Sequence, residues 1–403
     1  MTASEPKLLR FKSQKSFAHR LVLATLTGKA IHISQIRPNS HSNPGLAPHE
    51  ISFLRLLEAV TNGSHIEISY TGTTVVYKPG LIIGSTLGSG AVGGVIRHAL
   101  PATCTRGVSY FIIPLCLLAP FSKAHINVLL TGDGVITSST EEGDISVDSV
   151  RTAILPLYAQ FGISNNIELR IIQRSNIGSN GRGGAGEVQL LFGHQVRLPK
   201  TVHSVKPGKI RKIRGVAYCT GVSTSNNARV IDEARGILNP LTPDTYIFSD
   251  VSSVPSLPLN HQSLSGHTRR TGVGFGLSLV AESSTGSLYS ADAVSPTSGG
   301  TRPEEIGRQC AFKLLESIAQ GGSVSMIAAP TVLTLMAMGS EDVSRLQMGK
   351  NVIGSQTMID LARDLVLFGA NTWAIRQVGD DAENDVFVNV VGRGVGNVGR
   401  KIA

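Results

Sequence analysis

Residues 52–80 read SFLRLLEAVTNGSHIEISYTGTTVVYKPG and contain one complete α/β unit. Starting at residue 51, every third residue is apolar up to residue 60, which predicts an amphipathic helix over 51–60. Gly63 follows, where a left-handed residue is needed to turn the chain from the helix into a strand. Polar and apolar residues then alternate in 65–70, and with the run 75–77 they predict two strands.

This order of helix, glycine, strand, loop and strand occurs twice more. The second helix ends at Gly162 and the third at Gly369. The third glycine lies about 100 residues further along the chain than one repeat length would place it, so an insertion separates the second and third copies. The elements predicted for these copies are helix 150–161, strands 167–172 and 187–192, a helix from the capping box Thr301-Arg302-Pro303-Glu304 to about residue 318, helix 359–366, and strands 372–378 and 386–391.

The inserted segment has its own α/β pattern, with predicted strands over 213–222, 245–250 and 275–281 and a helix over 224–238. We therefore expect an α/β (α+β) fold of three repeated α/β units with a small inserted α/β domain. The expected boundaries are 1–100 for the first repeat, 101–207 for the second, 208–292 for the insertion and 293–403 for the third.

The apolar runs and the cysteine spacing argue against a membrane protein, a zinc protein and a disulfide-rich protein. The longest apolar runs, 110–121 and 326–338, are too short to span a bilayer, and we expect no membrane partner. The four cysteines lie far apart without a C-x-x-C pair, which argues against a zinc site and against a disulfide framework. We therefore expect no metal.

The glycine-rich stretch 84–94, GSTLGSGAVGG, contains the spacing G-x-G-x-x-G. In dinucleotide-binding proteins this spacing joins a strand to a helix, and an acidic residue follows about 20 positions later. Here Pro101 interrupts any helix, and the next acidic residue is Asp133. We interpret the stretch as a surface loop and expect no cofactor.

The net charge of +9 is unevenly distributed. No acidic residue lies between Glu5 and Glu50 or between Glu187 and Asp232. Long stretches of one sign favour a polyanion such as RNA, although solvated lysines or contacts with acidic protein segments would give the same pattern. The candidate RNA- or partner-binding residues in the two stretches are Arg20, Arg37, Arg197, Lys200, Lys206, Lys209, Arg211, Lys212 and Arg214.

Several motifs follow this layout in order: 21–29 (LVLATLTGK), 71–74 (TGTT), 78–80 (KPG) and 183–188 (GGAGEV). With the repeat architecture, they resemble the RNA 3′-terminal phosphate cyclase family. The sequence of residues 52–80 most resembles the eukaryotic cyclase-like branch of that family. That branch implies early small-subunit (18S) pre-rRNA processing and 40S ribosome biogenesis, in the nucleolar pre-ribosomal particle. The implied partners are a ribosome-assembly GTPase, pre-rRNA and other small-subunit processome proteins.

The resemblance also implies where catalysis would lie. Family cyclases move AMP from ATP to a histidine of the third repeat and then to an RNA 3′-phosphate. The matching stretch 348–356 contains no histidine, and His267 is the last histidine of the chain. The family's glycine-rich opening is replaced by Ser13–Ser16. We therefore expect no catalytic residue, and Lys350 is a weak substitute.

Two other functions stay open. An RNA-processing enzyme, either a pre-rRNA endonuclease or a residual cyclase, could use Arg363 and Asp364 as a phosphate clamp and a base. Adjacent helical residues point about 100° apart, however, which disfavours this pair. Alternatively, the chain is a protein-binding module whose basic stretches contact acidic partners.

Overall fold

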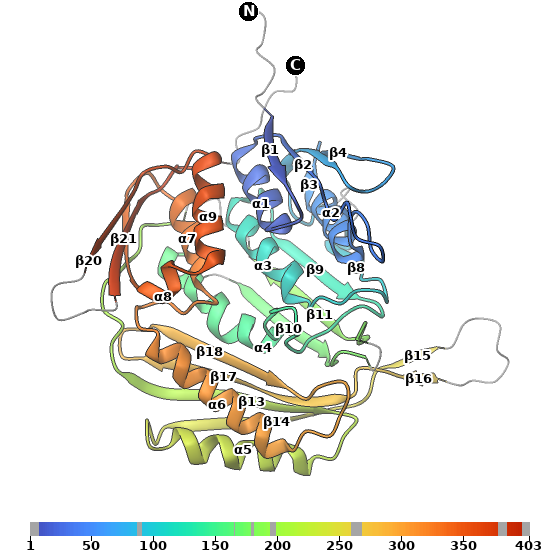
Figure 1. Cartoon of the computed structure of the whole chain (residues 1–403), viewed down its shortest axis with the longest axis vertical. Helices are drawn as coiled ribbons and strands as arrows, with labels where there is room; N and C mark the ends of the chain where they lie inside the picture. The colour runs from blue at the N-terminus through green and yellow to red at the C-terminus, as the bar shows by residue number, and fades with distance from the viewer. Residues whose placement is uncertain are drawn as a thin grey trace, which may run out of the picture.

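Three sheets of the molecule repeat one topology (Figure 1). The structure is a computed structural model that describes residues 8–86, 91–164, 166–178, 181–193, 199–258, 268–377 and 385–396. In each repeat, the first strand pairs in parallel with the second, and the remaining two strands follow antiparallel. The equivalent strand orders are β1-β2-β5-β4, β8-β9-β11-β10 and β12-β19-β21-β20, and β7 extends the second sheet beyond β8.

The first repeat places α1 between its two parallel strands. All eleven residues of α1 are buried or partly buried, and Gly28 ends the helix with φ of 63°. Pro48 opens α2, and the Glu50 carboxylate accepts a hydrogen bond from the Ala47 N–H at 2.8 Å. The elements are β1 (Leu9–Lys12), α1 (Phe17–Thr27), β2 (Ile31–Ser34), α2 (Pro48–Val60), β3 (Thr61–Asn62), β4 (His65–Ile68), β5 (Val75–Lys78) and β6 (Leu81–Ile82).

The second repeat follows the same path with one irregular helix. Its second helix changes from α to π and then to 3₁₀ geometry, and Pro156 lies where the 3₁₀ segment begins. Gly162 ends it with φ of 73°. The elements are β7 (Ala91–Val92), β8 (Val95–Ala99), α3 (Ser109–Leu118), η1 (Ala119–Phe121), β9 (Ile126–Thr131), α4 (Val147–Ser149), η2 (Val150–Ile154), η3 (Leu155–Phe161), β10 (Ile167–Gln173) and β11 (Glu187–Phe192).

The third repeat is split by the insertion. Its first strand, β12, comes before the inserted segment, and its first helix, α7, comes after it. The two ends meet, because the Ser323 hydroxyl donates to the Ser204 carbonyl at 2.8 Å. The elements are β12 (His203–Ser204), α7 (Ala329–Met338), β19 (Val343–Gly349), α8 (Lys350–Ile353), α9 (Gln356–Leu367), β20 (Trp373–Gln377) and β21 (Asp385–Val391).

The inserted unit is a sheet of order β14-β13-β17-β18 with α5 and α6 on one face. Its core is separate from the large core shared by the three repeats, and it includes Val230 of α5 and Leu314 of α6. The elements are β13 (Ile210–Thr220), α5 (Ser225–Leu238), β14 (Thr245–Ser252), β15 (Ser256–Pro258), β16 (Thr268–Arg270), β17 (Gly274–Ser283), β18 (Leu288–Val294) and α6 (Pro303–Ala319).

Charged and hydroxyl side chains join the insertion to the second repeat. Arg174 of the second repeat contacts Asp148 through Nη1 at 2.6 Å and also pairs with Asp250 of β14. Asp292 of β18 is partly buried and accepts hydrogen bonds from the hydroxyls of Ser146 and Ser278 at 2.8 and 2.6 Å. The junction is therefore polar rather than apolar.

The expected repeats and the expected mixed α/β fold are confirmed, with two local corrections. Gly63 has the expected left-handed φ of 78°, but it lies between β3 and β4, because α2 already ends at Val60. Arg302 rather than Thr301 caps α6, and no side-chain hydrogen bond forms there. None of the helices in the described ranges combines the length and apolar character needed to cross a membrane.

The domain boundaries stay a prediction, and the packing indicates where they need revision. β12 lies in the range expected for the second repeat, yet it pairs with β19 of the third sheet. The helix α6 was expected in the third repeat, but Ile306 and Leu314 pack in the core of the insertion. An insertion with α6 included, flanked on both sides by third-repeat residues, fits these contacts.

Candidate functional site at the junction of the three repeats

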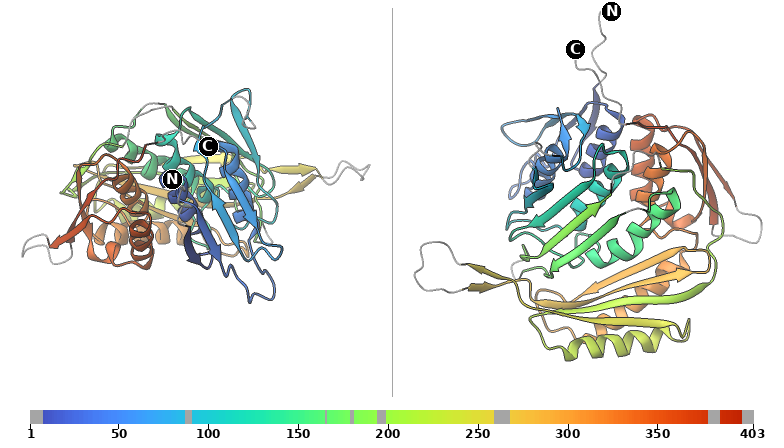
Figure 2. Two further views of the ribbon diagram at one scale, coloured as in Figure 1. Left: turned by 90° about the horizontal axis from the view of Figure 1, so that it is seen from above. Right: turned by 180° about the vertical axis from the view of Figure 1, so that it is seen from behind.

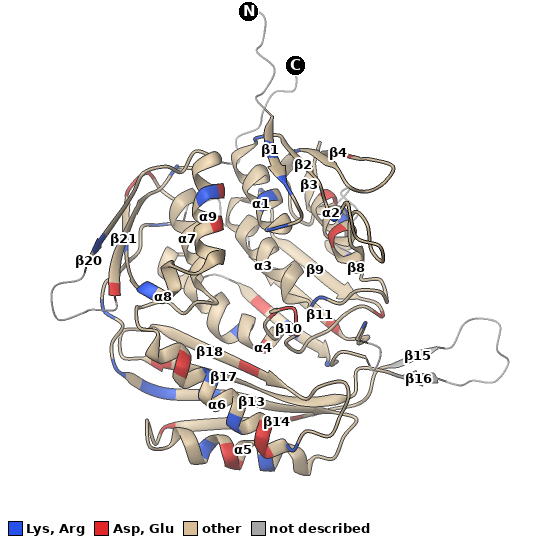
Figure 3. Ribbon diagram, viewed as in Figure 1, with Lys and Arg blue, Asp and Glu red and all other residues tan. Residues whose placement is uncertain are grey.

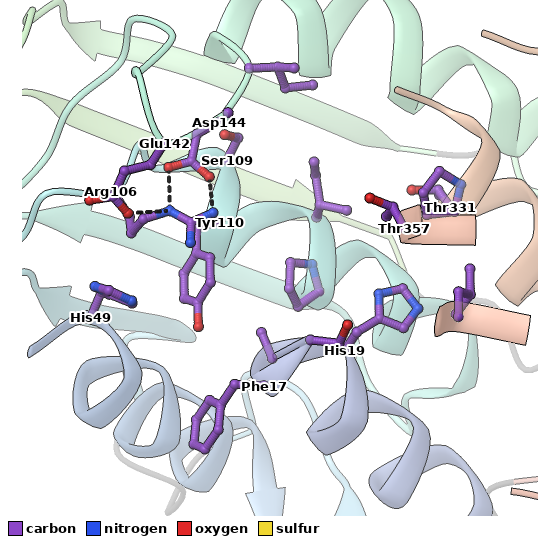
Figure 4. A pocket seen from close by; sticks show the side chains of 18 of the residues that line it. Phe17, His19, His49, Arg106, Ser109, Tyr110, Glu142, Asp144, Thr331 and Thr357 are labelled. Atoms are coloured by element: carbon purple, nitrogen blue, oxygen red, sulfur yellow. Dashed lines mark hydrogen bonds and ion pairs between the residues drawn. The ribbon is translucent and has the colours of Figure 1, made fainter. Parts of the chain in front are cut away.

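A cavity of about 560 Å³ lies where the three repeats meet. Each repeat forms one wall of it, as Figure 4 shows for a subset of the side chains. The first repeat supplies Gln14, Ser16, Phe17, Ala18, His19, Arg37, His49 and Glu50; the second Arg106, Ser109, Tyr110, Ile113, Pro114 and 142–145; the third Met326, Ile327, Pro330, Thr331, Thr357, Leu361 and Asp364.

Arg106 is held by carboxylates of a neighbouring loop. Its Nε and Nη2 atoms lie 2.7 and 2.5 Å from the two oxygens of Asp144, and Glu142 approaches Nε at 3.5 Å. The Gly107 N–H also donates to Asp144 at 2.7 Å. The guanidinium carbon lies 4.5 Å from the centre of the Tyr110 ring, as in a cation–π contact. Arg106 is therefore fixed and neutralised before any ligand arrives.

Arg37 is engaged in the same way on the first-repeat wall. Its guanidinium pairs with Glu50 and donates to the Gly45 carbonyl at 2.9 Å. The Glu50 carboxylate is itself buried and also caps α2. Removing Arg37 from this arrangement to bind a phosphate would leave Glu50 buried without its cation.

Two histidines of the first repeat face the cavity. Burial lowers the pKa of His19 to about 4, so the ring is neutral at pH 7. Its Nε2 lies 2.9 Å from the Thr334 hydroxyl, whose proton goes to the Pro330 carbonyl, so His19 Nε2 carries the hydrogen. Burial, with Arg106 and Arg37 nearby, lowers the pKa of His49 to about 4. Both imidazoles are therefore uncharged.

The charges of the lining do not fit a polyphosphate. Four carboxylates, those of Glu50, Glu142, Asp144 and Asp364, line the cavity together with two guanidinium groups, and Arg20 outside the lining pairs with Asp364. Phosphate sites in proteins present surplus cations or unpaired backbone N–H groups instead. The residues present therefore do not fit ATP, and we derive no step through it.

Among the described residues, the third-repeat wall contains no histidine, lysine or cysteine side chain. Its lining residues are apolar, hydroxyl-bearing or, at Asp364, acidic. Lys350 opens α8 and does not line this cavity. His203, which the structure assigns to the third sheet, is exposed on β12 and also lies outside the lining. In the described ranges, no three His, Cys, Asp or Glu side chains are grouped so that they could hold a metal ion.

Comparison with known proteins gives this arrangement its context. The sequence model of the family described as RNA 3′-terminal phosphate cyclase matches residues 9–371. The chain belongs to this family. It is 37% identical over 406 residues to the fission yeast (Schizosaccharomyces pombe) rRNA processing protein rcl1, covering 99% of each chain. It is 37% identical to the Saccharomyces cerevisiae rRNA processing protein RCL1 over the full length of both.

A human relative carries the family name directly. The Homo sapiens RNA 3′-terminal phosphate cyclase-like protein is 38% identical over 352 residues, which cover 86% of this chain and 85% of the human one. The three-repeat architecture and the junction cavity of this chain are therefore those of an RNA 3′-terminal phosphate cyclase family member.

The structure places the candidate binding residues of the two basic stretches in different environments. Arg20 and Arg37 lie at the junction, and both are already paired. Arg20 Nε donates to Asp364 Oδ2 at 2.9 Å, and its guanidinium lies over the Phe11 ring at 4.6 Å. Arg20 is buried, so its geometry does not offer it to RNA. Arg197 lies outside the described residues.

The remaining candidates lie at the entrance to the insertion and along β13, where Figure 3 shows basic positions. Lys212 pairs with Glu282 at 2.9 Å, and Arg214 pairs with Asp244 at 2.9 Å. Four further cations are exposed and form no ion pair with a described residue: Lys200, Lys206, Lys209 and Arg211. These four are the accessible part of the predicted basic stretch.

Arg363 and Asp364 do not converge. Arg363 is 73% exposed at its side chain and lies 3.9 Å from Asp360, whereas Asp364 is buried against Arg20. Their separation agrees with the angular argument against a shared phosphate. The Asp364 carboxylate instead forms part of the cavity wall.

Sequence reasoning missed most of the cavity residues. His19, His49, Arg106, Tyr110 and Asp144 lie far apart in the chain and match no spacing motif. The available signal was the three-fold repeat itself, because equivalent segments of packed repeats meet at their common centre. The glycine-rich stretch 84–94 lies only in part within the described residues, and none of its described residues lines this cavity.

Proposed function

We propose that this chain is a non-catalytic member of the cyclase family that acts in rRNA processing. The observation that carries the proposal is the third-repeat wall of the junction cavity, which offers no histidine, lysine or cysteine to carry AMP. The surplus of carboxylates over guanidinium groups supports the same conclusion. The relatives named as rRNA processing proteins support the role itself.

The finer assignment extends this proposal. We place the chain in early 18S pre-rRNA processing and 40S biogenesis, in the nucleolar pre-ribosomal particle with a ribosome-assembly GTPase. The exposed cations Lys206, Lys209 and Arg211 support contact with pre-rRNA, since phosphate contacts require accessible charges. The neutralised Arg20 would instead hold the first and third repeats together, and the neutralised Arg37 would stabilise the start of α2 within the first repeat.

The test of catalytic silence is incubation of the purified protein with ATP labelled at its α-phosphate. We expect no labelled protein after denaturing electrophoresis, while a family cyclase run in parallel becomes labelled. Acid-labile label on this chain would overturn the proposal. Labelling of a His19→Ala and of a His49→Ala variant would then show which ring carries the adduct.

The processing role is tested by depleting the protein from cells. We expect 18S precursors to accumulate while 25S or 28S precursors mature normally. Tagged protein should sediment with the pre-ribosomal particle and co-purify with a GTPase. Normal 18S maturation after depletion would contradict the proposed role.

An enzymatic function is the alternative, and one observation favours it. The two neutral imidazoles of His19 and His49 face the same cavity, and a neutral imidazole is able to accept a proton. A residual cyclase or an endonuclease would have to use them. Cleavage of a pre-rRNA fragment by the pure protein, lost in the His49→Ala variant but retained in Arg363→Ala, would favour this alternative.

A further inference from the structure

The edge strand of the inserted sheet exposes two aromatic rings side by side. Tyr246 and Phe248 of β14 are 56% and 55% exposed. Their ring centroids lie 4.5 Å apart and the rings are nearly perpendicular, at 77°. Single exposed apolar side chains are common on proteins, but a pair of large rings in contact on an open sheet calls for an explanation.

The two rings point away from the core of the insertion. Thr245 and Ile247, which alternate with them, are buried on the face that α5 covers. Because side chains alternate along a strand, Tyr246 and Phe248 lie on the opposite face of the sheet. The view from behind in Figure 2 looks onto this face. The second repeat covers the part of the face formed by β17 and β18, where Ser278 and Asp292 contact Ser146, and it reaches the far end of β14 at Asp250, which pairs with Arg174.

Cations of the neighbouring strand lie on the same face. In the parallel register of β13 and β14, Arg214 lies opposite Tyr246, and Val216 lies opposite Phe248. Lys212 comes two residues before Arg214 and shares its face. The exposed Lys209 and Arg211 lie at the same end of β13. The rings and the basic stretch predicted from the sequence therefore form one continuous surface.

We propose that this surface, formed by Tyr246, Phe248, Lys209, Arg211, Lys212 and Arg214, binds single-stranded RNA by base stacking. This inference rests on the proposed function and names the form of RNA that the protein recognises. Open sheets that bind single strands stack bases on exposed aromatic rings, while neighbouring cations contact the backbone. Any base can stack on the ring faces, so the surface distinguishes single-stranded from double-stranded RNA and does not distinguish one sequence from another.

The ion pairs on this face do not prevent phosphate binding. Lys212 with Glu282 and Arg214 with Asp244 are exposed pairs, with side chains between 37% and 56% accessible. Exposed pairs contribute little, and a phosphate can replace the carboxylate partner. Lys209 and Arg211 form no ion pair with a described residue, so they are available from the start.

A protein partner fits the face less well. A stable protein interface buries about 800 Å² on each side, with an apolar centre. The two rings offer at most about 250 Å² each, and their neighbours on β13 are charged at Lys212 and Arg214. Two rings beside four cations suit one or two bases and the phosphates that follow them.

The test measures binding of the full-length protein to a labelled oligouridylate of about 10 nucleotides and to a duplex RNA of equal length. We expect the single strand to bind more tightly than the duplex. The variant Tyr246→Ala/Phe248→Ala should weaken single-strand binding by about 10-fold or more, because each stacked base is worth roughly 1–3 kcal/mol. Tyr246→Phe keeps the ring and should bind within about 2-fold of the wild type.

Two control experiments distinguish a loss of base stacking from a loss of charge and from misfolding. Phe312→Ala removes a ring that is 54% exposed on α6, on the other face of the same unit, and should leave binding unchanged. Removing Lys209 and Arg211 should lower the salt dependence of binding, by about 0.7 in the log–log slope per charge, whereas removing the rings should not. Equal thermal midpoints of the ring variants and the wild type establish that they fold.

The outcomes distinguish the inference from the proposed function. If the wild type binds the single strand and the ring variant binds equally well, the stacking surface is overturned while an RNA-binding role stands. If the wild type does not bind RNA at all, both fall. Crosslinks from the β14 peptide to protein rather than to nucleotides in the assembling particle would assign this face to a protein partner and overturn the inference.

Discussion

At the scale of single residues, His19 makes the protein sensitive to acid. Its pKa is about 4 in the folded chain and about 6.5 when unfolded, so the unfolded chain binds the proton first as the pH falls. The stability that depends on neutral His19 is complete above pH 6.5 and is lost between pH 6.5 and 4. This loss should amount to about 2 kcal/mol at pH 5.

The variant His19→Gln checks this prediction, because an amide can replace the hydrogen bond to Thr334 without titrating. Urea unfolding at pH 7 and pH 5 should show a smaller loss in the variant than in the wild type, by about 2 kcal/mol. His41→Gln, at an exposed position, serves as the control and should keep the wild-type loss. An equal loss in His19→Gln would mean that other groups cause the acid sensitivity.

The ion pair of Arg20 with Asp364 should be a stability determinant. Its members join α1 of the first repeat to α9 of the third, with side chains 11% and 6% exposed. Arg20→Met would leave the carboxylate buried without its cation, at a cost of about 3–5 kcal/mol in the free energy of unfolding. Replacing both, as Arg20→Met/Asp364→Leu, should recover most of the loss.

A neighbouring pair on the same two repeats provides the control. Lys15 contacts Asp360 at 2.6 Å, but the lysine side chain is 53% exposed. Lys15→Met should therefore shift the denaturation midpoint only slightly. If Arg20→Met were as mild as Lys15→Met, the buried pair would not hold the two repeats together.

Residue roles were the least predictable part of the site. Arg20 and Arg37 were singled out as cations, and no sequence pattern indicated that Asp364 and Glu50 would neutralise them. Asp364 is more than 300 positions from Arg20, so their contact depends on how the repeats pack. In contrast, the absence of a histidine from 348–356, the stretch that the family resemblance singles out, could be read from the sequence alone.

At the scale of elements, alanine substitutions at two glycines should change the free energy of unfolding in opposite directions. Gly369 follows α9 with φ of 95°, where an added Cβ would lie 3.3 Å from the Arg393 guanidinium. Gly369→Ala should cost at least about 1 kcal/mol. Gly236 lies inside α5, and an added Cβ there meets nothing within 4 Å. Gly236→Ala should stabilise the protein by roughly 0.5–1 kcal/mol.

Thermal and urea unfolding of the two glycine variants measure both effects on one protein. The opposite signs are the informative part, because both changes add the same methyl group. A destabilised Gly236→Ala variant would mean that α5 has a partner on its outer face in solution.

Most elements could be predicted because their periodicity is strong and their ends are marked. The strand predicted over 187–192 matches β11, and Gly162 and Gly369 end their helices as expected. The two-residue strand β12 carries no periodicity, so the start of the third repeat could not be placed. The position of α6 was also missed, since an amphipathic helix does not reveal which sheet it covers.

At the scale of the whole molecule, the three repeats should fold without the insertion. The two units have separate cores, and among the described residues of the insertion only Val280 and Leu288 join the large one. Replacing residues 206–321 by a short Gly/Ser linker should give a soluble protein with a cooperative unfolding transition. Circular dichroism and calorimetry check this, and an unfolded product would mean that the polar junction around Arg174 is indispensable.

The same deletion separates two functions of the chain. The shortened protein lacks Tyr246, Phe248 and the cations of β13, so it should bind single-stranded RNA weakly if at all. The junction cavity should persist, because none of its lining residues belongs to the insertion. The overall layout of repeats and insertion was predictable from glycine spacing, whereas this division of surfaces depended on the folded contacts.

The hydrogen bond between Ser323 and Ser204 bears on how such a chain can change over time. An insertion whose two ends lie side by side does not strain the three repeats, whatever its length. Changes in the length or sequence of the insertion should therefore leave the sheets of all three repeats in register. New binding surfaces can therefore arise in the insertion while the three-repeat framework is kept.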